Sequence, residues 1–180
     1  MNTLILILLV LAGIIALLLI TGLFMKRDHF VKREIVIQAP LREVFDYLKL
    51  LKNQDHFNKG AMAGPERIRE YKGTDGTVGF VYAWRGNKDA GEGEKEIMNI
   101  EDGKRIVAEI RFKKPMAAAS TIVMETASLS ADQTRVSWSN SGTLKYPFNI
   151  LIPMLEKRLP ADMDESLGNL KNILEKNHRG

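Results

Sequence analysis

The sequence has no cysteine in its 180 residues, which excludes disulfides, cysteine zinc sites and thiol catalysis. Histidine is also scarce: His29, His56 and His178 lie too far apart to suggest a zinc site. The net charge of +4 is modest, and no stripe of lysine and arginine with interleaved aromatic residues is present, so a nucleic-acid partner is not expected. Neither a metal nor a cofactor is expected.

Charge is also missing from residues 4–24, which are almost entirely leucine, isoleucine, valine and alanine. A helix of this length reaches about 30 Å, the thickness of the hydrocarbon core of a bilayer. We therefore expect a transmembrane helix over residues 3–25. A cleaved signal peptide is the alternative. It is disfavoured because the run is long, no lysine or arginine precedes it, and no small-x-small cleavage site follows it.

Four cations follow this segment closely: Lys26, Arg27, Lys32 and Arg33. The positive-inside bias then predicts a single-pass protein of the cell (inner) membrane with its folded part in the cytoplasm. The same cations are suited to anionic headgroups, so membrane lipid is an expected partner.

After a link at residues 26–30, the chain is expected to form one α+β domain over residues 31–177. A strand at 31–38 and a helix at 41–52 come first, followed at 53–64 by a polar segment with a second short helical turn and a loop. From residue 65 the apolar period changes to two, which predicts six strands at 66–71, 78–84, 92–100, 106–112, 117–129 and 134–144, with a hairpin loop at 85–91. Short turns between consecutive strands are typical of an antiparallel meander.

The tail of the chain has helical periodicity from Leu151 to Leu174. Pro153 and Pro160 are expected to break it into a short apolar helix and a long one over about 161–176. This long helix is the element available to cover the apolar face of the sheet. A curved sheet wrapped on one helix encloses space between the two.

Three groups of residues together resemble the START-like (SRPBCC) superfamily, in its polyketide cyclase/dehydrase-like branch, over about residues 31–177. They lie at the strand-to-helix entry, around the central hairpin and in the closing helix: Ile37, Ala39, Pro40, Val44, Phe45, Tyr47 and Leu48; Trp84, Gly86, Asn87, Gly91, Gly93 and Glu94; and Leu167, Leu170, Lys171 and Leu174. Membrane-tethered versions look like a bacterial subset of this superfamily.

The resemblance implies a helix-grip fold with a cavity for hydrophobic ligands such as lipids, sterols, polyketides or aromatic compounds. It implies no catalytic set, because the superfamily shares none. The chain departs from the pattern after the first helix, where Asp55, His56 and Phe57 stand in place of tryptophans.

Inward-facing strand and helix positions predict the cavity wall, with plain core packing as the alternative: Phe80, Tyr82, Trp84, Ile106, Ile110, Phe112, Trp138, Asn140, Leu155, Met163 and Leu167. The dense apolar run at residues 148–155 has two interpretations. It is either core or a cover over the cavity that touches the bilayer.

Two residues are weak candidates for acid/base catalysis. Glu92, Glu94 and Glu96 share one strand face and Lys95 points the other way, and three carboxylates against an apolar cavity are costly to ionise, so a solvated outer face is expected for the glutamates. If Glu94 instead points inward, burial raises its pKa and makes it the best acid. His56, beside Asp55, is the second candidate and has a plain surface histidine as its alternative.

Three functional hypotheses follow. The first is a membrane-anchored module that binds a hydrophobic small molecule or lipid without chemistry. The second is an enzyme of cyclase, dehydratase or hydrolase type that uses Glu94 or His56 with Tyr82 or Asn140 as the oxyanion partner. The third is a structural or partner-binding membrane protein with a filled interior and an exposed apolar patch elsewhere.

Overall fold

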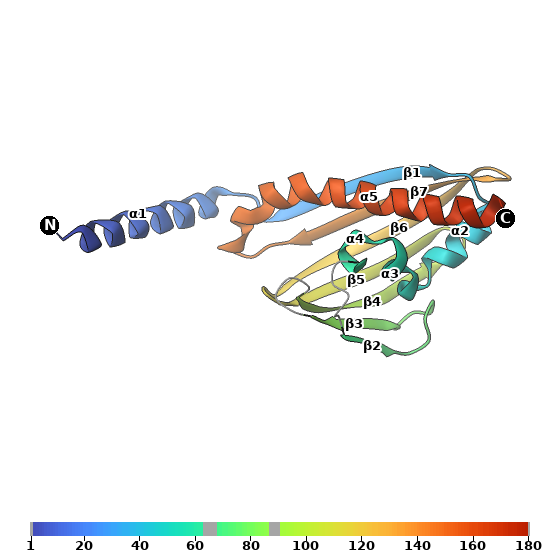
Figure 1. Cartoon of the computed structure of the whole chain (residues 1–180), viewed down its shortest axis with the longest axis horizontal. Helices are drawn as coiled ribbons and strands as arrows, with labels where there is room; N and C mark the ends of the chain where they lie inside the picture. The colour runs from blue at the N-terminus through green and yellow to red at the C-terminus, as the bar shows by residue number, and fades with distance from the viewer. Residues whose placement is uncertain (1, 63–67, 87–90, 180) are drawn as a thin grey trace.

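In the computed structural model, a seven-stranded antiparallel sheet curves around one long C-terminal helix, and an N-terminal helix extends away from this domain (Figure 1). The structure describes residues 2–62, 68–86 and 91–179. The expected strand start at 66–67 and the hairpin residues 87–90 lie outside the described residues. The fold is the α+β helix-grip arrangement expected from the sequence.

The first helix, α1 (Thr3–Phe24), consists of leucine, isoleucine and other uncharged residues, and its side chains are exposed along its length. It is long and apolar enough to cross a membrane by length and composition. Its C-terminal end is fastened to the domain, because the side chain of Asn149 donates hydrogen bonds to the carbonyls of Gly22 at 2.7 Å and Met25 at 3.1 Å.

The sheet has the order β1-β7-β6-β5-β4-β3-β2, and every neighbouring pair is antiparallel. Strands that follow one another along the chain therefore pair, except that β1 pairs with β7 at one edge. The strands are β1 (Asp28–Ile37), β2 (Ile68–Lys72), β3 (Val81–Arg85), β4 (Glu92–Glu101), β5 (Arg105–Lys114), β6 (Ala118–Ser130) and β7 (Gln133–Thr143).

Short helical segments connect β1 to the rest of the sheet: α2 (Leu41–Leu48), η1 (Leu51–Asn53), α3 (Gln54–Phe57) and α4 (Lys59–Met62). Pro40 stands at the N-cap of α2, and its missing N–H costs nothing there. Val44, Phe45 and Leu48 then recur on one helical face and are fully buried. The segment that begins with α2 thus brings α3 and α4 over the concave face of the sheet (Figure 1).

The segment η2 (Phe148–Leu151) precedes α5 (Ile152–Arg179), the helix that the sheet grips. Apolar side chains of α5, of α2 and of the sheet form one buried core, which includes Ile37, Phe45, Ile122, Met124, Val136, Met163, Leu167, Leu170 and Leu174. Burial of these side chains is the main favourable term holding helix and sheet together.

Several predicted boundaries were wrong. The first strand begins at Asp28, inside the expected link at 26–30, because β7 pairs with it as far as Thr143. The helix expected at 41–52, α2, ends at Leu48. The expected break in the tail is absent, since α5 is one helix from Ile152 with Pro160 inside it. Pro153 falls in its first turn, where no N–H is needed, and burial of Ile152 and Met163 on either side of Pro160 keeps the two halves in line.

Candidate functional site

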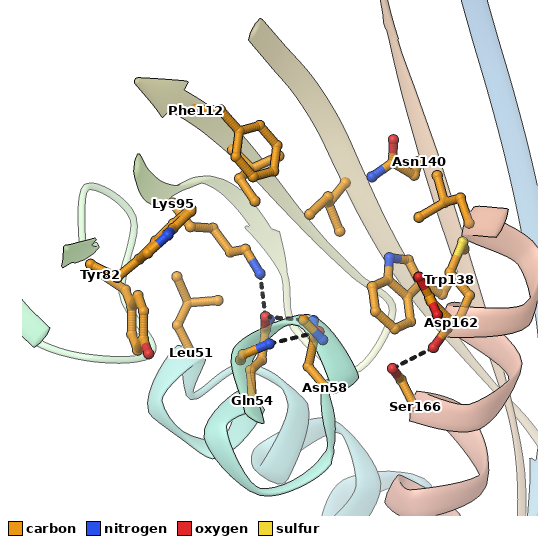
Figure 2. Close-up of a pocket in the computed structure, with 17 residues that line it drawn as sticks. Leu51, Gln54, Asn58, Tyr82, Lys95, Phe112, Trp138, Asn140, Asp162 and Ser166 are labelled. Atoms are coloured by element: carbon orange, nitrogen blue, oxygen red, sulfur yellow. Dashed lines mark hydrogen bonds between the residues drawn. The ribbon is translucent and has the colours of Figure 1, made fainter. Parts of the chain in front are cut away.

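A cavity of about 210 Å³ lies between the concave face of the sheet, the α3–α4 segment and α5 (Figure 2). Strands β3 to β7 supply its mainly apolar wall, and the helical segments supply most of its polar groups. Its lining comprises Leu51, Gln54, Asn58, Gly60, Ala61, Tyr82, Trp84, Lys95, Ile110, Phe112, Ile122, Trp138, Asn140, Leu159, Asp162, Met163 and Ser166. Phe112 keeps 39% of its surface exposed and Gly60 is exposed, so these two stand at the rim.

Seven of the eleven residues predicted for the cavity wall line this cavity: Tyr82, Trp84, Ile110, Phe112, Trp138, Asn140 and Met163. The other four are not among its lining residues. Phe80, Ile106 and Leu167 are buried in the apolar core, and Leu155 is half-buried in the first turns of α5. Strand alternation identified the inner face of the sheet, but it carries no information on which inner positions meet another side chain and which face open space.

One aromatic wall of the cavity depends on a glycine. Trp84 of β3 is paired with Gly93 of β4, and a Cβ at Gly93 would stand 2.5 Å from the indole ring and 2.7 Å from the carbonyl oxygen of Arg111. The bare glycine therefore lets the ring lie against the strand. There it meets Phe112 edge-on, with 5.8 Å between ring centroids.

Lys95 is the one charged side chain of β4 that faces inward, and it is only 7% exposed. Its Nζ donates a hydrogen bond to Oε1 of Gln54 in α3 (Figure 2). Among the described residues it forms no ion pair. Burial lowers the pKa of the Lys95 ammonium to about 8, and the negative charge of Asp55 offsets part of that effect.

The acceptor for Lys95 is held in place by the segment that carries it. Gln54 is 4% exposed, and Asn58 Nδ2 lies 3.5 Å from its Oε1. Just before it, the backbone N–H groups of Leu51 and Lys52 donate to the carboxylate of Asp75, at 2.8 and 3.1 Å. This fastens the start of the segment to the loop between β2 and β3.

Beside Lys95, a polar chain connects three elements. The hydroxyl of Tyr82 donates to Asp55 Oδ1 at 2.5 Å and accepts from Arg69 Nε at 3.1 Å, while Arg69 Nε also lies 3.0 Å from Asp55 Oδ2. Burial and the hydrogen bond to Asp55 raise the pKa of Tyr82 well above its ordinary value. Tyr82 is therefore a neutral wall residue, and the charge of Asp55 is compensated by Arg69 rather than by Lys95.

Neither candidate acid/base residue faces the cavity. Glu94 lies on the outer face of the sheet, where Arg111 Nε at 2.9 Å and Lys113 Nζ at 2.9 Å bind its carboxylate. These bonds, that to Lys113 first, lower the pKa of Glu94, which is opposite to the raised pKa that an inward position would give. His56 is exposed in α3 and does not line the cavity. No group of three or more potential metal ligands occurs among the described residues.

Two polar groups lie at the β7 side of the cavity. Asn140 Oδ1 is 2.9 Å from Nε2 of His29, a histidine that the sequence placed in the link but that is 5% exposed in β1. Trp138 is 5% exposed, and its indole Nε1 has no hydrogen-bond partner among the described residues.

The apolar run at residues 148–155 does not cover the cavity, because none of its residues is among the lining. Asn149 and Ile152 are fully buried, whereas Phe148, Leu151 and Met154 are exposed by 48%, 37% and 62%. The run is therefore only partly core. Its exposed members flank the point where Asn149 fastens α1 to the domain.

Sequence reasoning did not identify Lys95 and Gln54 as cavity residues. The signal for Lys95 was present, since a lysine between two outward glutamates of a strand must face inward. No comparable signal marks Gln54, because the polar segment 53–64 has no clear period, and its position depends on contacts with distant strands.

No protein-family model matches the chain, and no curated protein matches it. Many solved structures do. Truncated norcoclaurine synthase from Thalictrum flavum is 13% identical, with a TM-score of 0.63 over 84% of this chain and 96% of that one. Protein MLL2253 from Mesorhizobium loti is 12% identical, with a TM-score of 0.62 over 82% and 98%. The Aha1 dimer from Colwellia psychrerythraea is 14% identical, with a TM-score of 0.55 over 82% and 96%.

At such low identity these likenesses establish the fold alone. They agree with the START-like resemblance of the sequence at that level, and the chain has the helix-grip fold of these proteins.

Proposed function

We propose that the chain is a membrane-anchored module that binds a small hydrophobic molecule in the cavity between its sheet and α5, without chemistry. The observation that carries this proposal is the cavity itself, whose wall is mainly apolar and includes Trp84, Trp138, Ile110 and Ile122. Ligand sites in proteins are typically concave, mostly apolar and equipped with a few polar groups for orientation. A structural protein with a filled interior would have no such space.

The volume of the cavity limits the ligand. About 210 Å³ lies below the range of roughly 300–1,000 Å³ that is usual for ligand pockets. We therefore propose a single ring system or a single chain rather than a two-chain lipid. One structural neighbour, norcoclaurine synthase, is known in complex with dopamine and hydroxybenzaldehyde, so a protein of this fold accommodates small aromatic compounds.

Binding without chemistry is favoured over catalysis by the position of the acid/base candidates. Glu94 is bound by Lys113 and Arg111 outside the cavity, and His56 is exposed in α3. An acid or base must come within hydrogen-bond reach of its substrate, and neither residue meets that condition for a ligand in this cavity.

The binding test uses the full chain in nanodiscs and the neutral probe 4-phenylbutan-1-ol. Both tryptophans of the chain, Trp84 and Trp138, line the cavity, so their fluorescence reports occupancy directly. The probe should change this fluorescence saturably. Ile122→Phe, which adds volume inside the cavity, should weaken binding at least tenfold.

Thr121→Phe is the matched control, because Thr121 is the preceding residue of β6 and is exposed on the opposite face. It should bind the probe like the wild type. A wild-type chain whose tryptophans do not respond would refute the proposal, and so would equal binding by the Ile122 variant with a normal thermal midpoint. Native mass spectrometry after gentle extraction would then identify any mass that co-purifies.

The anchor is the second part of the proposal. The side chains of α1 are exposed, which in water would be costly for a helix of this composition, and a bilayer removes that cost. The cations after α1 favour a cytoplasmic domain. Because the chain lacks cysteine, Ala131→Cys in the exposed turn between β6 and β7 gives a clean test.

A membrane-impermeant maleimide should label Cys at position 131 only after the cells are permeabilised, whereas Thr3→Cys should be labelled in intact cells. The reverse pattern would place the domain outside the cytoplasm. Release of the protein by a carbonate wash would contradict the anchor itself.

A further inference from the structure

Two buried side chains that line the cavity, Lys95 and Trp138, carry N–H groups without an acceptor among the described residues. The Lys95 ammonium has three N–H groups, and its one hydrogen bond among the described residues goes to Gln54. The indole N–H of Trp138 has no acceptor among them. Both side chains are more than nine-tenths buried, and buried donors without acceptors are rare in folded proteins because each costs its lost hydration.

The acceptors around the cavity are already engaged. Gln54 Oε1 accepts from Lys95, and Asn140 Oδ1 lies against His29. Asp162, at the helix side, has its carboxylate 3.0 Å from Lys59 Nζ and 3.6 Å from Arg158 Nε. Ser166 Oγ accepts from the backbone N–H of Lys59 and donates to the carbonyl of Asp162.

The charged groups around Lys95 lead to the same conclusion as the hydrogen bonds. Asp55 is the carboxylate whose negative charge acts on the pKa of Lys95. Its own oxygens are bound by Arg69 and Tyr82. The amine therefore has no carboxylate at hydrogen-bond distance among the described residues, and the wall around it is apolar at Trp84, Ile110 and Ile122. A buried charge of this kind is stabilised by an opposite charge at hydrogen-bond distance.

We propose that the cavity selects small apolar carboxylic acids, whose carboxylate pairs with Lys95 while the apolar body packs against the aromatic and aliphatic wall. This inference rests on the proposed binding function and specifies its ligand class. The acid has two possible sources, either a single-chain fatty acid from the bilayer or a soluble aromatic acid, and both present the same carboxylate to the amine.

The test compares each acid with an alcohol of nearly the same shape, in phosphatidylcholine nanodiscs that carry the full chain. The pairs are 4-phenylbutanoate with 4-phenylbutan-1-ol, and decanoate with decan-1-ol. Tryptophan fluorescence reports binding, and empty nanodiscs correct for partition into lipid. At pH 7 the acid of at least one pair should bind ten times or more as tightly as its alcohol, because a hydrogen bond to a charged group is among the strongest in proteins. The preferred pair distinguishes the two sources.

Lys95→Met should remove this preference, because it should weaken binding of the acid at least tenfold more than binding of the alcohol. Lys113→Met, which removes an exposed lysine of the outer face, should keep the preference. Equal binding of acid and alcohol by the wild type, or an unchanged acid affinity in the Lys95 variant, would overturn the inference and leave the binding function standing. Failure of both members of both pairs to bind would overturn the two together.

Discussion

The two faces of strand β4 place cations in opposite surroundings. On the outer face, Arg111 of the neighbouring strand lies 2.9, 2.5 and 2.6 Å from carboxylate oxygens of Glu94, Glu96 and Glu109. On the inner face, Lys95 is buried with one neutral amide as its partner. The pKa of Arg111 is raised by its carboxylates, whereas the pKa of Lys95 is lowered by burial.

The two cations therefore differ in their effect on stability: the charge of Arg111 supports the fold, whereas the charge of Lys95 costs stability. The outer network is solvated, so it can be altered at small cost. The inner amine destabilises the empty domain, and an apolar residue of the same size would avoid that cost. A costly group that faces a cavity is a candidate for ligand recognition, which is the basis of the inference about Lys95.

The largest effect should come from removing the inner cation. Lys95→Met should raise the free energy of unfolding at pH 7 by on the order of 3 kcal/mol, because the lysine pKa falls from 10.5 to about 8 on folding. Since the folded pKa lies below the unfolded one, the penalty is complete below pH 8 and disappears as the pH rises to 10.5.

Thermal melts of the full chain in nanodiscs, at pH 7 and pH 10.5, would measure this gain. It should shrink at the higher pH, while Lys104→Met at an exposed position should change stability little at either pH. A Lys95 variant less stable than the wild type at pH 7 would mean that the amine supports the fold, and the contrast between the two faces would fail.

A smaller effect should follow from crowding the inner face. Gly93→Ala places a methyl group 2.5 Å from the ring of Trp84 and 2.7 Å from a backbone carbonyl, so the strand or the ring must move. We expect a loss of about 2 kcal/mol and a shift in tryptophan emission. Glu92→Ala, on the outer face of the same strand, should cost less than about 0.5 kcal/mol. Equal losses in the two variants would show that the inner face is not closely packed at Trp84.

The smallest effect should come from the outer face. Arg111→Met should cost about 1 kcal/mol or less at pH 7, because the network is partly exposed and screened by water. Glu94 has a lowered pKa, so its contribution is present above the ordinary carboxyl pKa and is lost as the pH falls through the lowered value.

The deficit of the Arg111 variant should therefore be smaller at pH 3 than at pH 7, and binding of 4-phenylbutan-1-ol should be unaffected at pH 7. Urea unfolding at the two pH values would measure it. A loss of several kcal/mol, or loss of probe binding, would show that the outer network holds the cavity wall in place.

Much of this architecture was readable from the sequence. The period-two pattern of Ile106, Ala108 and Ile110 predicted a strand with one apolar face. The same alternation in β4 predicted that Glu94 and Glu96 lie on the outer face of the sheet. Boundaries were less accurate, because the length of β1 depends on its pairing with β7 and the continuity of α5 past Pro160 depends on the core on either side. The candidate site was predicted as a wall of aromatic and aliphatic residues with Asn140, but without the polar segment that completes it.

The sequence by itself determined the uncharged N-terminal helix, the order of the strands, and the opposite sheet faces of Glu94 and Lys95, because these follow from local composition and from the periods of helix and strand. Only the tertiary structure decided that Lys95 and Gln54 meet at one cavity. Their positions result from long-range packing of α3 and α5 against the sheet. No short-range sequence pattern shows how deeply a charged side chain is buried or whether it has a partner there.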